Sequence, residues 1–291
     1  DEKGRYYCYT CQATGNAINF LQETQDLRFG EAITELANRY EIEGAEVLTG
    51  DLDAMEEAPW QPPPLDVLQQ PLVEANLAAA NYYKAVRRTP AATECANMLR
   101  ARGVTNQVAE IFGLGFAPES PRSRGALGAH LQTATALTDS NVILAGLCSP
   151  NDGGKANAAT EGGGRRRLYD RFRNRLIIPI HDSYGRVVGL GGRLIGESTD
   201  RMEPKYLNSP ESSVFKKAKL LYGMHLARGP IIRSGKALIV EGYMDVISLH
   251  SAGLNYAVAC LGTALSEAQV EMAVEPLGNA GGQNKRRQVV I

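Results

Sequence analysis

No apolar stretch long enough to cross a membrane occurs in the 291 residues, because every candidate run is shorter than about 18 residues. The first five residues, Asp-Glu-Lys-Gly-Arg, also lack the basic and then apolar order of a secretory signal. We therefore expect a globular protein of the cytoplasm without a membrane partner. A hydrophobic content of 44% is enough for one large core or two modest ones.

Cysteine is scarce, and its number is odd. The five cysteines favour reduced thiols or a metal site over a disulfide framework. Cys8 and Cys11 have the two-residue spacing that lets two thiolates reach one tetrahedral zinc ion. The four histidines lie far from this pair in the sequence, so a redox pair or two buried thiols remain alternatives. If zinc is bound, its other two ligands must precede Asp1.

Net charge is nearly absent, at -1, but the two signs are segregated along the chain. Residues 1 to 66 contain 14 acidic residues against 4 Lys or Arg, whereas residues 165 to 236 contain 16 Lys or Arg against 6 acidic residues. A basic segment of this kind can bind a polyanion by counterion release. The alternative is a solvated basic face that balances the acidic end.

Apolar spacing divides the first 116 residues into two helical parts and a linker. Residues 29 to 40 carry apolar side chains at intervals of three and four, which predicts an amphipathic helix. Residues 45 to 65 run from an acidic stretch into four prolines, so we expect a semi-rigid linker. Residues 66 to 116 predict further helices, one to about Arg88 and one around 95 to 101.

Residues 151 to 167 contain five glycines and end in three consecutive arginines. A segment of this composition cannot bury a core, so we expect a surface loop. Its arginines either contact a phosphate backbone or belong to a solvated insertion.

Strand patterns dominate from Leu176 onward. The sequence predicts a β-hairpin with its turn at 182 to 185, in which Pro179 would keep its strand at a sheet edge. Strands at 237 to 240, 256 to 260 and 288 to 291 then alternate with two helices. This βαβαβ order predicts a parallel sheet with functional groups at the carboxyl ends of its strands. The expected fold class is therefore multidomain, with a mixed α+β core and a Rossmann-like α/β sheet.

Glu241 directly follows the first of these strands and precedes Gly242, with Asp245 one helical turn later. A carboxylate at a strand end, next to a glycine that permits close approach, suits a hard divalent cation that bridges phosphate oxygens. The alternative is an acidic residue that stabilises the N-terminus of the following helix.

Arg171, Arg173 and Arg175 alternate with other residues, so in an extended segment all three guanidinium groups would point the same way and suit phosphates. The basic character continues further along the chain at Arg193, Lys205, Lys216, Lys217 and Lys219. Tyr206 and Phe215 lie among these residues, where they would either stack on bases or pack in the core.

These strings resemble one family, the DnaG-type bacterial primases. The similar segments are, in order, Tyr7 to Phe20, Tyr169 to Ile180, Gly191 to Arg193, Pro204 to Pro210, Phe215 to Gly223 and Glu241 to Thr263. The resemblance implies four parts. They are the C-terminal part of a CHC2-type zinc-binding domain, zinc-ribbon-like (1–44), a linker (45–65), the N-terminal subdomain of a primase RNA polymerase core (66–234) and a Toprim fold (235–291).

The resemblance also implies a DNA primase, a metal-dependent nucleotidyltransferase that makes short RNA primers. Its partners would be a single-stranded DNA template, ribonucleoside triphosphates, the RNA–DNA hybrid and a replicative helicase. Glu241 would be a Mg²⁺ or Mn²⁺ ligand or an acid/base group, supported by Asp245. The remaining roles fall to residues of the basic motifs and of the cysteine pair: Lys205 and Lys217 would be catalytic, Asn208, Arg171, Arg173, Arg175 and Arg193 would bind nucleotide or template, and Cys8 and Cys11 would be two of four zinc ligands.

Two departures from the family pattern lead us to expect truncation. The sequence starts after the position of the family's first two zinc ligands and stops at Ile291, before its metal-binding Asp-x-Asp pair and its helicase-binding end. With Glu241 alone we expect weak metal binding, and therefore poor or absent polymerase activity of this piece by itself. Two alternatives remain, another Toprim enzyme such as a topoisomerase or nuclease, and a non-catalytic single-strand binding module.

Overall fold

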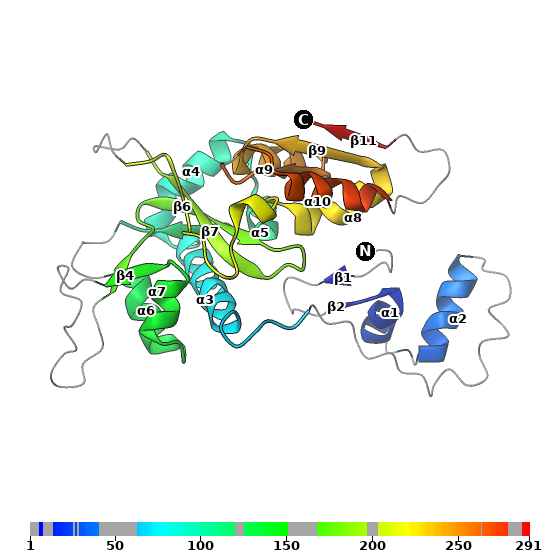
Figure 1. The fold of residues 1–291 in the computed structure, drawn as a ribbon, viewed down its shortest axis with the longest axis horizontal. Coiled ribbons are helices and arrows are strands. Elements are labelled where there is room, and N and C mark those ends of the chain that lie inside the picture. Colours follow the sequence, from blue (N-terminus) through cyan, green and yellow to red (C-terminus); the bar gives the residue numbers. More distant parts are fainter. Residues whose placement is uncertain are drawn as a thin grey trace. The chain divides into compact units, whose positions relative to one another are not determined.

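The computed structural model describes residues 6–7, 14–25, 27, 29–40, 63–119, 125–150, 168–196, 203–262, 264–278 and 287–291 (Figure 1). The chain divides into two compact units, residues 1–64 and 65–291, and each is described by itself. None of the described helices combines the length and hydropathy needed to cross a bilayer. Cys8, Cys11 and the segments expected as linker and surface loop lie wholly or mostly outside the described residues.

The first unit contains a two-stranded antiparallel sheet and two helices. Strands β1 (Tyr6–Tyr7) and β2 (Thr14–Gly15) pair, and α1 (Ala17–Gln25) and α2 (Phe29–Arg39) follow. At the start of α1, Asn16 and Asn19 cap each other reciprocally, since each backbone N–H donates to the other's Oδ1 at 3.0 and 2.9 Å. The helix predicted for residues 29 to 40 is confirmed.

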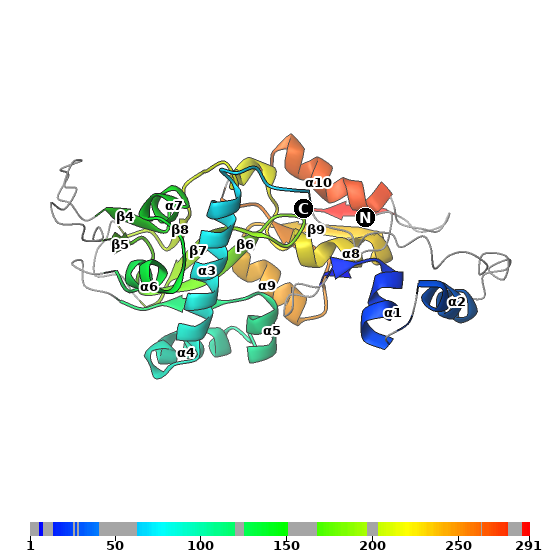
Figure 2. The same ribbon diagram turned by 90° about the horizontal axis from the view of Figure 1, so that it is seen from below.

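The second unit begins with helices. Helix α3 (Gln70–Arg87) starts with a proline in its first turn, and a 3-10 turn (Pro90–Ala92), α4 (Thr93–Ala101) and α5 (Asn106–Ile111) follow. The two predicted helices are thus confirmed. Figure 2 shows α3 lying across the strands of an antiparallel sheet. Gly115 permits this close approach, because a Cβ there would lie 2.6 Å from the Cβ of Tyr83 on α3.

That antiparallel sheet has the strand order β3-β6-β7-β8. Its strands are β3 (Gly115–Ala117), β6 (Arg175–His181), β7 (Val187–Leu194) and β8 (Tyr206–Asn208). The predicted hairpin is confirmed as β6 and β7, but the expectation that Pro179 keeps its strand at an edge is wrong. β3 pairs only with residues 175 to 177, so Pro179 has a neighbouring strand on one side only even though β6 is internal.

Two short antiparallel strands form a smaller sheet, and two helices pack beside it. Strands β4 (Cys148–Pro150) and β5 (Leu168–Asp170) pair, and α6 (Ala126–Ala134) and α7 (Asp139–Leu144) pack beside them. The buried carboxylate of Asp170 accepts hydrogen bonds of 2.9 Å from the backbone N–H groups of Leu127 and Gly128, which are unpaired at the start of α6. Gly125 leaves room for this contact, since a Cβ there would lie 2.2 Å from Asp170 Oδ1.

The C-terminal part forms the expected parallel sheet. Helix α8 (Met224–Ser234) ends at Gly235, whose φ of 69° suits glycine, and β9 (Lys236–Val240) follows. The remaining elements are α9 (Tyr243–Ser251), β10 (Ala257–Ala259), α10 (Glu267–Gly278) and β11 (Gln288–Val290). Both pairings in the order β10-β9-β11 are parallel, which confirms the predicted βαβαβ unit.

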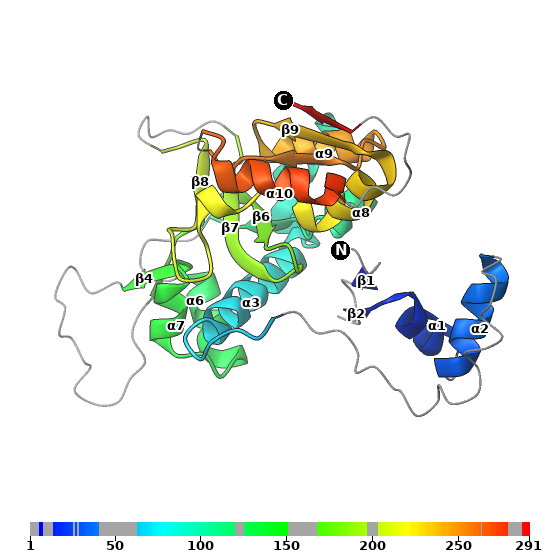
Figure 3. The ribbon, with the colours of Figure 1, turned by 45° about the vertical axis from the view of Figure 1, so that its right-hand side comes forward.

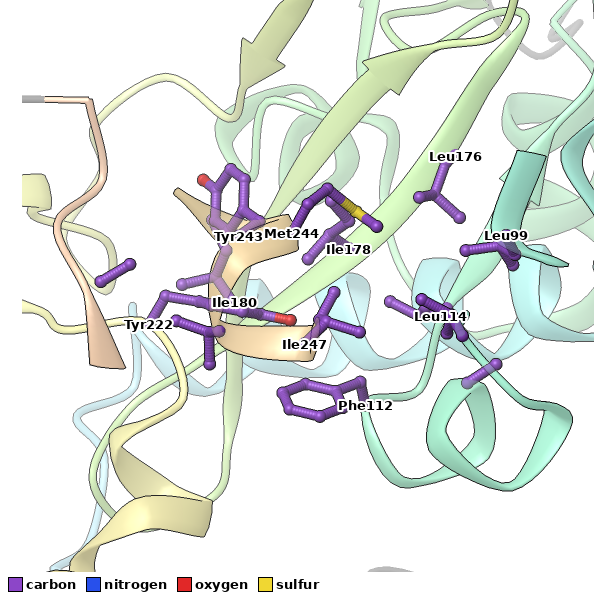
Figure 4. Close-up of a cluster of buried hydrophobic side chains, with 14 of the residues drawn as sticks. Leu99, Phe112, Leu114, Leu176, Ile178, Ile180, Tyr222, Tyr243, Met244 and Ile247 are labelled. Carbon is purple, nitrogen blue, oxygen red and sulfur yellow. The ribbon is translucent and has the colours of Figure 1, made fainter. Parts of the chain in front are cut away.

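One hydrophobic core joins the antiparallel sheet to α9 of the parallel sheet (Figure 4). Figure 3 shows the ribbons of both sheets. Leu176, Ile178 and Ile180 of β6 face α9, whereas Ile177 belongs to a second core with α3 and α6. Both faces of β6 are therefore covered, which is why its sequence is continuously apolar. The domain boundaries expected from the sequence remain predictions.

Candidate functional site

Glu241 occupies the short turn between β9 and α9. Val240, the last residue of β9, pairs with Ala259 at the end of β10, so Glu241 and Cys260 leave the parallel sheet at the same edge. The side chains of Glu241 and Asp245 are both exposed. A Cβ on Gly242 would lie 3.3 Å from Asp245 Oδ2, which places the Asp245 carboxylate against the turn. The structure thus confirms the predicted placement of Glu241 at a strand's carboxyl end.

The described residues contain no group of three or more His, Cys, Asp or Glu arranged to hold a metal ion. Glu241 and Asp245 nevertheless offer the oxygen ligands that Mg²⁺ and Mn²⁺ prefer. Mg²⁺ usually binds through one or two carboxylates together with substrate phosphates and water. The donor chemistry of this turn therefore fits a cation that arrives with a phosphate ligand.

Strand β8 carries exposed groups that can meet a nucleic acid. The Lys205 side chain is exposed, and Tyr206 keeps 39% of its surface accessible. Arg193 of β7 is mostly buried behind Tyr206, donates a hydrogen bond of 3.0 Å to its hydroxyl, and places its guanidinium 5.6 Å from the ring centroid. Arg193 therefore braces Tyr206 from behind, and the Tyr206 ring is the group that is open for stacking.

Arg171, Arg173 and Arg175 do not form the predicted row. β5 ends at Asp170 and β6 starts at Arg175, and Asn174 between them has a left-handed φ of 46°, so the segment is not extended. Arg175 is only 1% exposed and donates to the carbonyls of Gly192 and Pro204 and to the Glu203 carboxylate. The expectation that Arg175 grips phosphate conflicts with this burial.

The other two arginines of this segment differ from one another. Arg171 is half-buried and directs Nε and Nη2 to the carbonyl oxygen of Asn208, at 3.2 and 2.9 Å. Burial and then the nearby Arg175 charge lower the pKa of Arg171. Arg173 lies 4.5 Å from the ring centroid of Tyr169, and its buried Nε has no hydrogen-bond partner among the residues described. Arg171 thus supports β8 from behind.

Asn208 is the last residue of β8, and its side chain connects this strand to the parallel sheet. Its Oδ1 accepts a 2.7 Å hydrogen bond from the hydroxyl of Tyr243, the first residue of α9. Its Nδ2 donates to the carbonyl of Leu261, which follows β10, at 3.4 Å. The structure therefore brings Asn208 to the same end of the sheet as Glu241.

Lys217 lies on a 3-10 turn (Lys217–Lys219) that α10 fastens in place. The fully buried side chain of Gln269 donates to the carbonyls of Lys217 and Leu220, at 3.0 and 2.8 Å. Ser266 adds a 2.6 Å hydrogen bond to the Ala218 carbonyl. Neither residue is among those expected from the sequence, although Ser266-x-x-Gln269 has the spacing of a capping box.

Three family models match the chain. They are the CHC2 zinc finger at residues 1–49, the N-terminal domain of the DNA primase catalytic core at 82–228 and the Toprim domain at 235–291. Together with the α+β core and the parallel sheet, these matches confirm the expected fold class.

The curated relatives of this chain include proteins named DNA primase, and two of them come from Synechococcus elongatus and Pseudomonas aeruginosa. The chain is 40% identical to the protein from Synechococcus elongatus, over 92% of this chain and 35% of that protein. It is 38% identical to the protein from Pseudomonas aeruginosa, over 93% of this chain and 37% of that protein. The chain thus spans little more than a third of either relative.

Solved structures are similar too. The RNA polymerase domain of Mycobacterium tuberculosis primase DnaG, in complex with a double-stranded DNA oligomer that has a 6-nucleotide overhang, superposes with a TM-score of 0.64 at 32% identity. The match covers 76% of this chain and 62% of that one. The zinc-binding and RNA polymerase domains of Aquifex aeolicus primase give a TM-score of 0.60 at 30% identity, over 94% and 58% of the two chains.

Proposed function

Because the chain belongs to the DnaG-type DNA primases, we propose that the natural protein containing it synthesises short RNA primers on single-stranded DNA. The observation that supports this proposal most directly is the position of Glu241. Its carboxylate follows β9 at the end of the parallel sheet where Asn208 connects the sheet to the basic, aromatic strand β8. A metal-binding carboxylate and a nucleic-acid-binding strand would thus serve one reaction.

In this proposal a ribonucleotide 3′-hydroxyl loses its proton to solvent and attacks the α-phosphate of the next ribonucleoside triphosphate. A phosphodiester bond forms as the bond between the α- and β-phosphates breaks, and pyrophosphate leaves. Glu241, with Asp245 beside it, would hold a Mg²⁺ or Mn²⁺ ion, and the bound ion would supply positive charge that stabilises the negative charge of the reacting phosphates. Lys205 and Lys217 supply positive charge to the triphosphate, and the Tyr206 ring offers a face for a template base. Arg173 would contact the template, whereas Arg171, Arg175 and Arg193 would act through the strands that they support.

Further partners belong to the same proposal. Cys8 and Cys11 would be two ligands of a structural zinc ion, and the CHC2 zinc finger match over residues 1–49 supports this assignment. A related DnaG primase catalytic domain has been solved bound to single-stranded DNA, which supports a single-stranded template here. The RNA–DNA hybrid, a replicative helicase partner and a cytoplasmic location are proposed on family membership alone.

Primer synthesis in the natural protein tests the proposal. We would measure RNA made from labelled ribonucleotides on a mixed-sequence single-stranded template with Mg²⁺ or Mn²⁺. We expect Glu241→Gln to lower the rate by about 100-fold or more, because a neutral amide is a far weaker ligand for a hard cation, while template affinity is unchanged. Glu271→Gln, an exposed acid on α10, is the matched control and should keep full activity.

Either of two outcomes would contradict the proposal. Full activity of Glu241→Gln would remove this carboxylate from the chemistry. Tight template binding without any RNA product from the unmodified protein would favour a non-catalytic binding module. A different Toprim enzyme is disfavoured already, since the match to the primase catalytic core at 82–228 lies outside the Toprim region.

A further inference from the structure

Tyr243 carries a buried hydroxyl that reaches from the parallel sheet to strand β8. The residue is only 6% exposed, and its ring packs at 90° against Tyr222, with centroids 4.8 Å apart (Figure 4). Gly191 of β7 closes another side, because a Cβ there would lie 3.0 Å from Tyr243 Cζ and 3.1 Å from its hydroxyl oxygen. The ring is therefore held tightly, and its hydroxyl has one defined direction.

The Tyr243 hydroxyl points to Asn208, which forms hydrogen bonds through three of its groups. Its Oδ1 accepts from Tyr243 at 2.7 Å, its Nδ2 donates to the Leu261 carbonyl, and its own carbonyl accepts from the Arg171 guanidinium. Tyr243 and Leu261 follow the ends of β9 and β10, which are neighbours in the parallel sheet. A single side chain of β8 is thus fastened to two adjacent strand ends.

Glu241 and Lys205, which we propose to act in the reaction, are close in sequence to Tyr243 and Asn208. Glu241 precedes Tyr243 by two residues, and Lys205 precedes Asn208 by three. A shift of the Tyr243 backbone relative to Asn208 would therefore also move the backbone of Glu241 relative to that of Lys205. Transfer reactions are sensitive to such shifts, since a misplacement of about 1 Å can lower a rate by about 100-fold.

We propose that the Tyr243 hydroxyl and the Asn208 amide form a clasp that sets the position of Glu241 relative to strand β8. Both are positioning residues for nucleotidyl transfer, and this inference rests on the proposed function. The Tyr243 hydroxyl is the donor of this hydrogen bond, and Asn208 Oδ1 is the acceptor. The Asn208 side chain acts here through the protein and not as a direct ligand of the nucleotide.

Tyr243→Phe in the natural protein tests the clasp, because this change removes only the hydroxyl. We expect the turnover rate of dinucleotide formation to fall about 10-fold, which corresponds to about 1.4 kcal/mol in the activation free energy, while template affinity is unchanged. The melting temperature should fall by a few degrees at most, because Asn208 Oδ1 loses its donor. The expected loss appears in kcat and in the Mg²⁺ concentration needed for half-maximal rate.

Tyr222→Phe is the matched control. Tyr222 is also a fully buried tyrosine, it touches the same ring, and its hydroxyl has no hydrogen-bond partner within the described part of the chain. Its loss should leave kcat unchanged. In a double-mutant cycle, Tyr243→Phe should have little further effect in an Asn208→Ala background, whereas Asn208→Asp, which keeps an acceptor for Tyr243, should restore part of the rate.

The outcomes separate the clasp from the proposed function. A rate for Tyr243→Phe equal to that of Tyr222→Phe, in a protein that loses activity on Glu241→Gln, would refute the clasp and leave the primase proposal standing. Fully additive losses in the double-mutant cycle would also refute it. Undiminished RNA synthesis by Glu241→Gln would instead refute the assignment of the reaction to this carboxylate, on which the clasp depends.

Discussion

The guanidinium of Arg175 lies between strands and is satisfied by two backbone carbonyls and one carboxylate. Its side chain is 2% exposed, whereas that of its partner Glu203 is 33% exposed. Removing the cation would take one hydrogen-bond donor from each of the carbonyls of Gly192 and Pro204 and from the Glu203 carboxylate. The role of Arg175 is therefore to hold β7 against the chain that enters β8.

We expect Arg175→Met to lower the free energy of unfolding by about 3 kcal/mol, because breaking a buried charged network leaves its partners unpaired. Urea unfolding monitored by circular dichroism measures this change. Arg100→Met, at an exposed arginine of α4 that contacts Asn97, is the control and should cost less than about 0.5 kcal/mol. Unchanged stability of Arg175→Met together with lost template affinity would return Arg175 to a direct role in binding.

The position of Glu241 could be predicted from the sequence, because a short apolar strand, a glycine and an amphipathic helix fix a strand end locally. The roles of the arginines could not. Whether Arg171 or Arg175 faces solvent depends on the left-handed turn at Asn174 and on acceptors that lie 17 to 37 residues away. Alternation in a sequence gives direction only where the backbone is extended.

Helix α10 and the residue before it hold the basic turn that carries Lys217 in place through hydrogen bonds. Gln269 occupies the third helical position after Ser266, so its amide both closes the helix start and reaches two carbonyls of the 217–220 segment. Because these carbonyls have a buried donor, the turn is held to the parallel sheet independently of its own lysines.

We expect Gln269→Ala to destabilise the protein by about 2 kcal/mol, since two buried carbonyls lose their donor. The change should also speed amide hydrogen exchange in residues 217 to 220 more than elsewhere, because the turn would open locally. Exchange measured by mass spectrometry tests this against Glu271→Ala, an exposed position on the same helix. Equal exchange rates of residues 217 to 220 in the two variants would mean that Gln269 does not hold this turn in place.

The strands and helices of the parallel sheet could be predicted from the sequence pattern. Of the antiparallel sheet, only the hairpin could be predicted in this way. The hairpin of β6 and β7 is long and has a clear turn, in which Asp182 Oδ1 accepts from the N–H groups of Tyr184 and Arg186. Strands β3 and β8 are three residues each, too short for a periodic signal. The flanking partner of β6 therefore could not be predicted, and Pro179 was assigned to an edge.

One of the hydrophobic cores of the second unit combines residues that are far apart in the sequence, such as Phe112, which directly follows α5, and Ile247 on α9. Such contacts depend on how the two sheets pack, which local patterns do not contain. Three of the histidines illustrate this. His181 is the last residue of β6, His225 lies on α8 and His250 lies on α9. The sequence around each of them does not indicate which residues surround it in the fold.

Because of His181 and His225, we expect the stability of the second unit to depend on pH. The rings of His181 and His225 stack with centroids 4.1 Å apart, and burial lowers the pKa of His181 to about 4. Burial, and then the neighbouring histidines His181 and His250, lower the pKa of His225 as well. Because an unfolded histidine titrates near about 6.5, the unfolded chain binds more protons below that pH. The stability from the neutral imidazoles is complete above about pH 6.5 and is lost as pH falls toward 4.

We expect the free energy of unfolding to fall by about 1.4 kcal/mol per pH unit below pH 6.5 for each imidazole that stays neutral in the folded protein. Urea unfolding between pH 7 and pH 5 measures this slope in a range above most carboxylate titration. His225→Phe should flatten the slope, since it removes one of the groups that must stay neutral, whereas His130→Phe, at the exposed histidine of α6, should leave it unchanged. Equal slopes in the original protein and in His225→Phe would mean that the imidazole of His225 does not titrate differently in the folded and unfolded states.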